Sequence, residues 1–221
     1  MSLKALHAEL ITCRSCKRLV SWREQVGKEK VARHRDSEYW AKPVPGFGDP
    51  KARIVIFGLA PGAHGSNRTG RPFTGDSSGE FLYRALHRAG LCNQPESKHK
   101  EDGLKLKGVY ITASVRCAPP QNKPTPEEIR NCARWTEREL PLLPSVRVYL
   151  AQGRIAHDAL LAYYGLRKPA HGFGHGAEHP LPDGRVLIDS YHVSRQNTNT
   201  GKLTEAMFDL VMNRVKVLAG Y

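Results

Sequence analysis

The chain lacks a long hydrophobic run. No segment of its 221 residues holds the roughly eighteen consecutive apolar residues that a membrane-spanning helix needs, and residues 1–4 lack the apolar core of a signal peptide. Internal repeats and low-complexity tracts are also absent. We therefore expect a soluble, cytoplasmic protein without a membrane partner. Its length suits one well-buried α/β domain over residues 1–221.

Acidic residues are too few to balance the basic ones. The chain has 34 Lys and Arg against 21 Asp and Glu, which gives a formal net charge of +13. A surplus of this size favours a polyanionic partner, and nucleic acid is the most common one.

Cysteines are also few, and their number is odd. There are five in the chain, so a scheme built only of disulfides would leave one unpaired. In a reducing compartment, thiols more often bind metal or pack in the core. Cys13 and Cys16 form a Cys-x-x-Cys pair that can hold one metal centre, whereas Cys117 and Cys132 lie far apart in sequence. The spacing leaves an iron-sulfur cluster, a zinc site and unrelated core cysteines open.

Apolar runs alternate with helical patterns along the chain. Strand-like runs occupy residues 53–59, 108–114, 146–151 and 185–189. Helical patterns cover residues 3–12, 79–89, 154–164 and 203–218, and Thr125 begins a further helix with a capping box. We expect residues 17–52 to be irregular and residues 97–107 to be a mobile loop. This alternation predicts an α/β fold with a mostly parallel, four-stranded sheet.

The segment 58–76, directly after the first strand, is typical of a ligand-binding loop. Its five glycines let the backbone approach a ligand closely, and ligands sit at the carboxyl ends of strands in open α/β sheets. The glycine spacing matches no dinucleotide or triphosphate motif. Phe73 and Asp76 offer a stacking face and a charge, as a planar base requires. Without further motifs, a core anchor and a helix cap are the favoured explanation of these two residues.

Two further loops follow strands, at residues 114–126 and 192–201. The carboxyl ends of parallel strands share an edge, so Phe73, Asp76, Asn122 and His192 are expected to converge on one crevice. An Asn amide both donates and accepts, which matches the O4 and N3–H edge of uracil. A His can donate to a base carbonyl.

Together these motifs resemble the iron-sulfur uracil-DNA glycosylases, and within them family 5, the B type. The resemblance rests on the 58–76 loop with Ser78 and Gly79, the segment from Arg116 to Cys132, the loop beginning at His192, and the cysteine spacing. It implies a three-layer α/β/α sandwich and excision of a damaged base from DNA. It also implies a 4Fe-4S cluster on Cys13, Cys16, Cys117 and Cys132, which would tie the N-terminal helix to the Asn122 segment.

The same resemblance implies roles for single residues. Phe73 stacks on the flipped base, Asn122 contacts its edge, and His192 stabilises the departing base. The residues expected to bind the base are Gly58, Ala60, Gly62, Phe73, Asn122 and His192. Where other families have a polar residue that positions water, this chain has Leu59 and Ala60. Asp76 is therefore expected to act in catalysis with His192 and Asn122, by orienting water or stabilising the sugar cation.

A third set of residues is expected to contact DNA. Arg68, Arg71, Lys123 and Arg195 are candidate phosphate contacts, although each is also explained as part of a solvated basic face. Ser194, Arg195, Gln196 and Asn197 lie where they can fill the space left by an extruded nucleotide. Val193 stands where relatives commonly have proline, which affects the rigidity of this loop.

We therefore expect a monomeric, monofunctional glycosylase. It would remove uracil and other deaminated bases from DNA and leave an abasic site. No lysine is placed as a Schiff-base nucleophile, so no lyase activity is expected. Two alternatives stay open: a non-catalytic or covalently trapping relative that binds uracil-DNA, and a zinc-stabilised module that binds nucleic acid.

Overall fold

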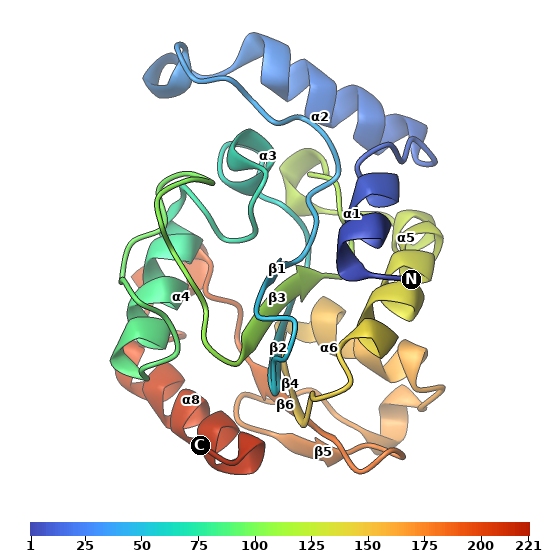
Figure 1. Ribbon diagram of the computed structural model, residues 1–221, viewed down its shortest axis with the longest axis vertical. Helices are drawn as coiled ribbons and strands as arrows, with labels where there is room; N and C mark the ends of the chain where they lie inside the picture. The colour runs from blue at the N-terminus through green and yellow to red at the C-terminus, as the bar shows by residue number, and fades with distance from the viewer.

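A six-stranded sheet forms the centre of the computed structural model, which describes residues 1–221 (Figure 1). Its strand order is β1-β3-β2-β4-β6-β5. The four inner strands are parallel, and the two edge strands are antiparallel to their neighbours. The strands are β1 (Phe47–Gly48), β2 (Ile54–Gly58), β3 (Val109–Ala113), β4 (Val148–Gln152), β5 (Glu178–Pro180) and β6 (Val186–Ser190).

The four inner strands confirm the predicted parallel sheet, but the predicted strand number of four is too low. The missed strands, β1 and β5, are two and three residues long. Segments this short are too brief to show an alternating apolar pattern. They add hydrogen bonds to the two edges without changing the parallel core.

Helices cover both faces of the sheet, which confirms the three-layer sandwich (Figure 1). The α-helices are α1 (Leu3–Leu10), α2 (Lys17–Glu29), α3 (Ser66–Thr69), α4 (Ser77–Arg88), α5 (Pro126–Glu139), α6 (Arg154–Tyr163), α7 (Arg195–Asn199) and α8 (Glu205–Ala219). Short 3-10 helices lie at Ala32–His34, Pro120–Asn122, Leu140–Leu142 and Lys168–Ala170. None of the helices is long and apolar enough to cross a membrane.

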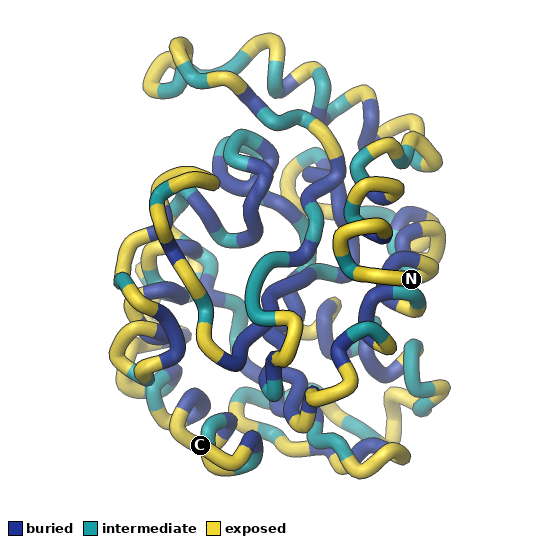
Figure 2. The backbone as a smooth tube through the Cα atoms, in the orientation of Figure 1, coloured by how far each residue is buried: buried dark blue, intermediate teal, exposed yellow.

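Alternate residues of each strand point to opposite faces. Ile54 and Ile56 pack into the core shared with α4 and α8, whereas Val55 and Phe57 pack into the core shared with α6. Every residue of β2 is buried, as expected for a parallel strand covered on both sides. Figure 2 shows the buried residues running through the middle of the molecule and the exposed ones on loops and outer helix faces.

Helix α2 corrects the expectation that residues 17–52 are irregular. Its buried positions are Leu19, Val20, Arg23 and Val26, which follow helical spacing. Arg23 occupies one of these inward positions, so the apolar period is interrupted in the sequence. The sequence pattern does not predict this helix because a charged residue occupies a core position.

A buried carboxylate joins α5 to the sheet and to α1. Glu139 is 1% exposed and accepts hydrogen bonds from the hydroxyl of Tyr110 (2.8 Å) and from Thr112 Oγ1 (2.7 Å). It forms an ion pair with the equally buried Arg116, and His7 Nε2 lies 3.3 Å from it. Burial raises the pKa of Glu139, but the Arg116 charge and these hydrogen bonds hold it well below its ordinary range.

This network predicts a large effect of removing one charge. Glu139→Gln keeps the side-chain shape but leaves the buried Arg116 cation without its anion. We expect a loss of about 3 kcal/mol in the free energy of unfolding, measured by urea denaturation. The matched control is Glu137→Gln, because Glu137 is exposed on the same helix. Equal midpoints for the two variants would show that the buried pair contributes nothing to stability.

Candidate active site

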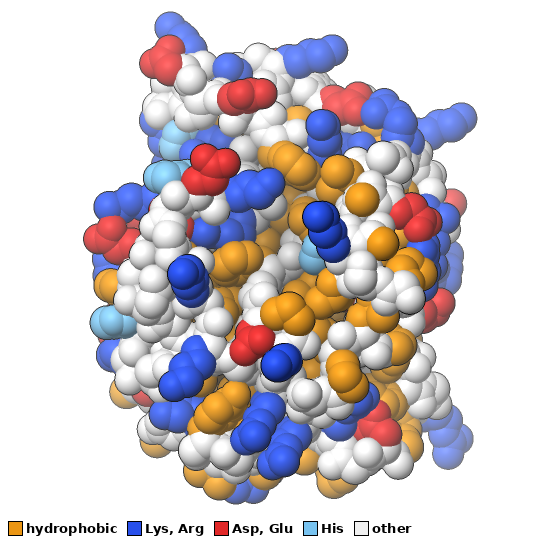
Figure 3. All heavy atoms as spheres, in the orientation of Figure 1, with side chains coloured by type: hydrophobic (Ala, Val, Ile, Leu, Met, Phe, Trp, Pro, Cys, Tyr) orange, Lys and Arg blue, Asp and Glu red, His pale blue; other side chains and the backbone are white.

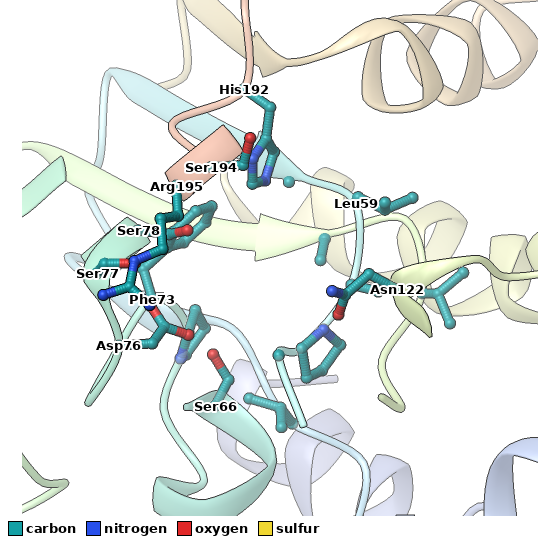
Figure 4. A pocket seen from close by; sticks show the side chains of 18 of the residues that line it. Leu59, Ser66, Phe73, Asp76, Ser77, Ser78, Asn122, His192, Ser194 and Arg195 are labelled. Atoms are coloured by element: carbon teal, nitrogen blue, oxygen red, sulfur yellow. The ribbon is translucent and has the colours of Figure 1, made fainter. Parts of the chain in front are cut away.

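A cavity of about 550 Å³ lies at the carboxyl edge of the parallel strands. Figure 4 shows the side chains that surround it, with Asp76 and Arg195 on one side, Asn122 on the other, and His192 at one end. Most of them come from the three loops that follow β2, β3 and β6, and Val44 and Pro45 come from the segment before β1. All six residues expected to bind the base line this one cavity: Gly58, Ala60, Gly62, Phe73, Asn122 and His192.

Phe73 is held tightly beside the end of β2. A Cβ added to Gly58 would lie 3.2 Å from the Phe73 ring, so glycine allows the ring to approach the strand. Phe73 itself has a positive φ of 49°, a conformation that is costly for a bulky residue. Its ring centre lies 6.1 Å from that of His192, with the planes inclined at 31°. The backbone strain keeps a partly exposed aromatic face in the cavity.

Asp76 is both the N-cap of α4 and a wall of the cavity. Its Oδ1 accepts a hydrogen bond of 2.9 Å from Gly79 N. Its Oδ2 faces Gly62 and Gly65, where an added Cβ would lie 3.0 Å and 1.9 Å from this oxygen. Burial raises the pKa of Asp76, while the backbone hydrogen bonds at the start of α4 act in the opposite direction. The geometry therefore permits a capping role and a catalytic role together.

Asn122 lies on an exposed turn at the opposite wall (Figure 4). Gln121 and Asn122 both have positive φ, at 54° and 56°. Asn adopts this conformation readily, but Gln does so rarely. Arg18 fixes the turn, because it donates to the Lys123 carbonyl (3.0 Å) and pairs with Glu128 on α5. The Asn122 amide is thus presented on a strained and tethered turn.

His192 follows β6 at the far end of the cavity. Its carbonyl accepts a hydrogen bond of 2.8 Å from Asn197 Nδ2, and the next residue, Val193, is fully buried in the core. Burial lowers the pKa of His192 to about 4. The imidazole is therefore neutral near pH 7 and offers one N–H donor to the cavity.

The mouth of the cavity carries four of the residues expected to contact DNA. These are Lys123, Ser194, Arg195 and Gln196. Lys123, Arg195 and Gln196 are exposed. Asn197 differs from them, since it does not line the cavity and its side-chain amide holds the His192 carbonyl. Its observed role is to shape the loop.

The expectation that Arg71 contacts phosphate is corrected. Arg71 is 2% exposed and pairs with both carboxylate oxygens of Asp102, at 2.8 Å and 2.7 Å. It also donates to Ser97 Oγ (2.9 Å) and Thr74 Oγ1 (2.9 Å). This guanidinium has no donor left for DNA. It ties residues 97–102 to the cavity loop, so the expected mobile loop is fixed over this part.

Arg68 also serves the loop. Its guanidinium donates to the carbonyls of His64 (2.8 Å), within the glycine-rich segment, and Gly75 (3.1 Å), near its end. It does not line the cavity, and its phosphate contact stays a prediction. Many other Lys and Arg side chains lie on the surface, as Figure 3 shows for one face, around a hollow that gathers hydrophobic side chains.

The structure brings four of the five cysteines to one corner, beside α1, α2 and α5. They are Cys13, Cys16, Cys117 and Cys132, and they share a small hydrophobic cluster. Each sulfur lies within reach of an N–H donor. The pairs are Arg134 Nη2 to Cys13 (3.2 Å), Asn131 Nδ2 to Cys16 (3.9 Å), Arg23 Nη1 to Cys117 (2.7 Å) and Arg116 N to Cys132 (3.3 Å).

The charge at this corner fits a set of thiolates. Arg23 is 2% exposed and forms no ion pair with a carboxylate; its partners are Cys117 Sγ and the Cys13 carbonyl. A buried cation needs an anion nearby. Burial raises the pKa of the Cys117 thiol to about 11 and that of Cys132 to about 12. Such thiols lose their protons when they bind metal, which would supply the negative charge.

A second group of possible metal ligands was missed from the sequence. His157, His179 and Asp189 are buried, and their ligand atoms lie within 4.8 Å of one another. However, both ring nitrogens of His157 already make direct hydrogen bonds, to Asp189 Oδ1 (2.8 Å) and to the His171 carbonyl (2.9 Å). The group is therefore a hydrogen-bond hub. Its members are far apart in the sequence and form no recognisable spacing.

The chain matches known proteins over most of its length. A model of the Uracil DNA glycosylase superfamily matches residues 45–216. A type-5 uracil-DNA glycosylase from Thermus thermophilus is 66% identical over 220 residues, which covers 100% of both chains. Its counterpart from Pyrobaculum aerophilum is 44% identical and covers 96% of this chain and 91% of its own. A type-4 uracil-DNA glycosylase from Archaeoglobus fulgidus is 38% identical over 56% of this chain and 54% of its own. The chain therefore belongs to the uracil-DNA glycosylase superfamily, in its type-5 family.

Proposed function

We propose that this protein is a monofunctional DNA glycosylase of base excision repair. It hydrolyses the N-glycosidic bond of uracil and other deaminated bases in DNA and leaves an abasic site. The observation that carries this proposal is the cavity that unites an aromatic face, an amide, a carboxylate and a neutral imidazole. Among the residues that line it, Lys123 is the one lysine, and it is exposed at the mouth. This supports hydrolysis without a Schiff base.

Base recognition depends on two opposite walls. The base must leave the stack to reach the cavity, which costs a few kcal/mol. Stacking on Phe73 offsets part of this cost. The Asn122 amide donates to O4 and accepts from N3–H of uracil, so one side chain reads both groups. A base with a different edge would leave one of these groups unpaired.

His192 stabilises the leaving base. When the bond between C1′ and the base breaks, the electron pair leaves with the base and negative charge builds on its carbonyl oxygen. His192 is neutral because its pKa is about 4, and its N–H donates to this oxygen. Residues 58–62 line the same cavity, and their backbone N–H groups, which Pro61 lacks, can share this charge.

Asp76 serves the sugar side of the reaction. The sugar becomes positively charged as the base leaves, and water then adds its oxygen to C1′ and gives up a proton, which neutralises the departed base anion. A carboxylate at the cavity wall stabilises this cation and orients the water. Leu59 and Ala60 hold no group that could do so. This division of labour assigns the anion to Asp76 and the donor to His192.

DNA approaches the mouth of the cavity. Lys123 and Arg195 are exposed there and contact phosphates, while Gln196 enters the space left by the flipped nucleotide. The net charge of +13 supports binding to a polyanion. One chain supplies every residue of the cavity, so we propose a monomer. We also propose that it acts in the cytoplasm.

The cysteine corner is proposed to hold a 4Fe-4S cluster on Cys13, Cys16, Cys117 and Cys132. One tight pair, Cys13 and Cys16, with two separated cysteines accommodates the spread of such a cluster. The buried Arg23 cation beside Cys117 supports an anionic centre at this corner. The cluster supplies a structural tie between α1, α2, α5 and the segment that carries Asn122.

The first test is cleavage of uracil-containing DNA. We expect free uracil and a strand that alkali breaks at the former uracil position, with no reaction on the same duplex carrying cytosine, whose edge reverses the donor and acceptor that the Asn122 amide meets. The reaction is followed by denaturing electrophoresis after alkali treatment. A stable protein–DNA adduct without free uracil would instead identify a relative that traps its substrate.

The second test separates Asp76 from His192 by pH. Asp76 acts as an anion, so the single-turnover rate should fall as pH drops through its raised pKa. His192 is already neutral, so no step is expected near its ordinary pKa of about 6.5. Asp76→Asn retains an N-cap acceptor but should remove the acid limb and lower the rate roughly a hundredfold. His192→Asn should lower the rate and leave the limb in place.

A wild-type rate in Asp76→Asn would reduce Asp76 to a helix cap. An acid limb that moves with the His192 substitution, and not with Asp76, would reverse the two assignments. Because Asn caps helices about as well as Asp, the unfolding midpoint of Asp76→Asn should stay close to that of the wild type.

The third test is metal content. The purified holoprotein should be coloured and contain about four iron atoms per chain. Cys132→Ser should lose iron and colour, whereas Cys92→Ser should keep both, because Cys92 lies in the core between α4 and β3 and outside the cysteine corner. A colourless protein that carries zinc would favour the zinc-stabilised module.

A further inference from the structure

His175 makes an unexpected contact with the base of the His192 loop. Its Nδ1 accepts a hydrogen bond of 3.2 Å from the backbone N–H of Tyr191, the residue directly before His192. The two rings are stacked, with centres 5.0 Å apart and planes inclined at 19°. His175 therefore holds Tyr191 by both its backbone and its side chain. The sequence gives no sign of this contact, since the residues are sixteen positions apart.

The segment that carries His175 is rich in glycine, yet it is fixed by one buried carboxylate. Asp189 Oδ2 accepts from Gly174 N (3.3 Å) and lies 3.1 Å from His179 Nε2. Its backbone carbonyl accepts from Gly176 N (2.8 Å), and its backbone N–H donates to Ala177 O (3.0 Å). Asp189 belongs to β6, so this segment is attached to the strand that delivers His192.

We propose that His175 is a positioning residue for His192, and this inference rests on the proposed role of His192 in catalysis. The backbone is held on both sides of the His192 side chain, at the Tyr191 amide and at the His192 carbonyl, by different side chains. Asn197 Nδ2 donates to its carbonyl, and His175 Nδ1 accepts from the amide of the residue before it. Both contacts come from outside the cavity. They fix the direction from which the His192 imidazole enters it.

A histidine suits this task because its neutral ring accepts at one nitrogen and stacks with its face. Only an unprotonated Nδ1 can accept from the Tyr191 N–H. Burial lowers the pKa of His175, with the Met207 backbone acting in the opposite direction, and this favours the accepting form. No carboxylate is hydrogen-bonded to His175.

The experiment compares His175→Leu with His175→Asn. Leu keeps bulk but removes the acceptor, whereas the Asn carbonyl can occupy the Nδ1 position. Single-turnover cleavage of uracil-DNA is measured beside the dissociation constant for DNA that carries a non-cleavable uracil analogue. His175→Leu should lower the rate roughly tenfold or more through misplacement of His192, with affinity unchanged within about twofold. His175→Asn should restore most of the rate.

A double-mutant cycle identifies His192 as the intermediary. In a His192→Ala background, His175→Leu should cause no further loss of rate, because the group that it positions is gone. An equal loss in both backgrounds, a loss confined to affinity, or a wild-type rate in His175→Leu would overturn the inference. So would an Asn variant as slow as the Leu variant. His175→Gln, whose amide reaches the Nε2 position, replaces Leu where that variant does not fold.

The same panel keeps the two proposals apart. If His192→Ala cleaves at the wild-type rate, the proposed catalytic role of His192 fails. If His192→Ala is slow but His175→Leu is not, the role of His192 stands and only the positioning role of His175 fails.

Discussion

The buried ion pair between Arg116 and Glu139 joins helix α5 and the sheet to the cysteine corner and to the loop that carries Asn122. Glu139 joins α5 to the sheet, and Arg116 directly precedes Cys117. The Arg116 amide also donates to Cys132, so the cysteine corner and the carboxylate share one residue. The loop that continues from Cys117 carries Asn122 to the cavity. If either side chain moved, its charge would become exposed or would lose its partner in the core. The pair therefore holds α5 and the Arg116 segment rigidly together.

The cavity combines groups that also have structural roles. Asp76 ends a loop and caps a helix, and it lines the cavity where we propose that the sugar cation forms. Phe73 is held in a strained backbone conformation that presents its ring. Arg68 donates to two carbonyls of the loop, and Arg71 joins the loop to Ser97 and Asp102, so both cations brace it. The strained backbone conformation in the loop is thus maintained by residues that do not line the cavity.

Sequence patterns predicted what depends on local periodicity and on motifs. The four parallel strands and the capping box at Thr125 confirm those predictions. The convergence of Phe73, Asp76, Asn122 and His192 followed from the rule that parallel strands share a carboxyl edge. Features that depend on pairing between distant residues escaped prediction. The Arg71 side chain is bound by Asp102, which is distant in the sequence, and so is not free for phosphate. Arg23 occupies a core position of α2 and interrupts the apolar pattern that would have predicted this helix.

The two walls of the cavity differ in composition: glycine backbone lies at one and a side chain on an exposed turn at the other. At the Asp76 side, Gly62 and Gly65 face the carboxylate with bare backbone, and a Cβ at position 65 would lie 1.9 Å from Oδ2. Opposite them, Asn122 stands on an exposed turn with open solvent behind it. The glycine backbone leaves little room for a side chain beside Asp76, because an added Cβ would crowd its carboxylate. A different side chain is accommodated more easily at position 122, which is exposed on a turn that Arg18 holds in place.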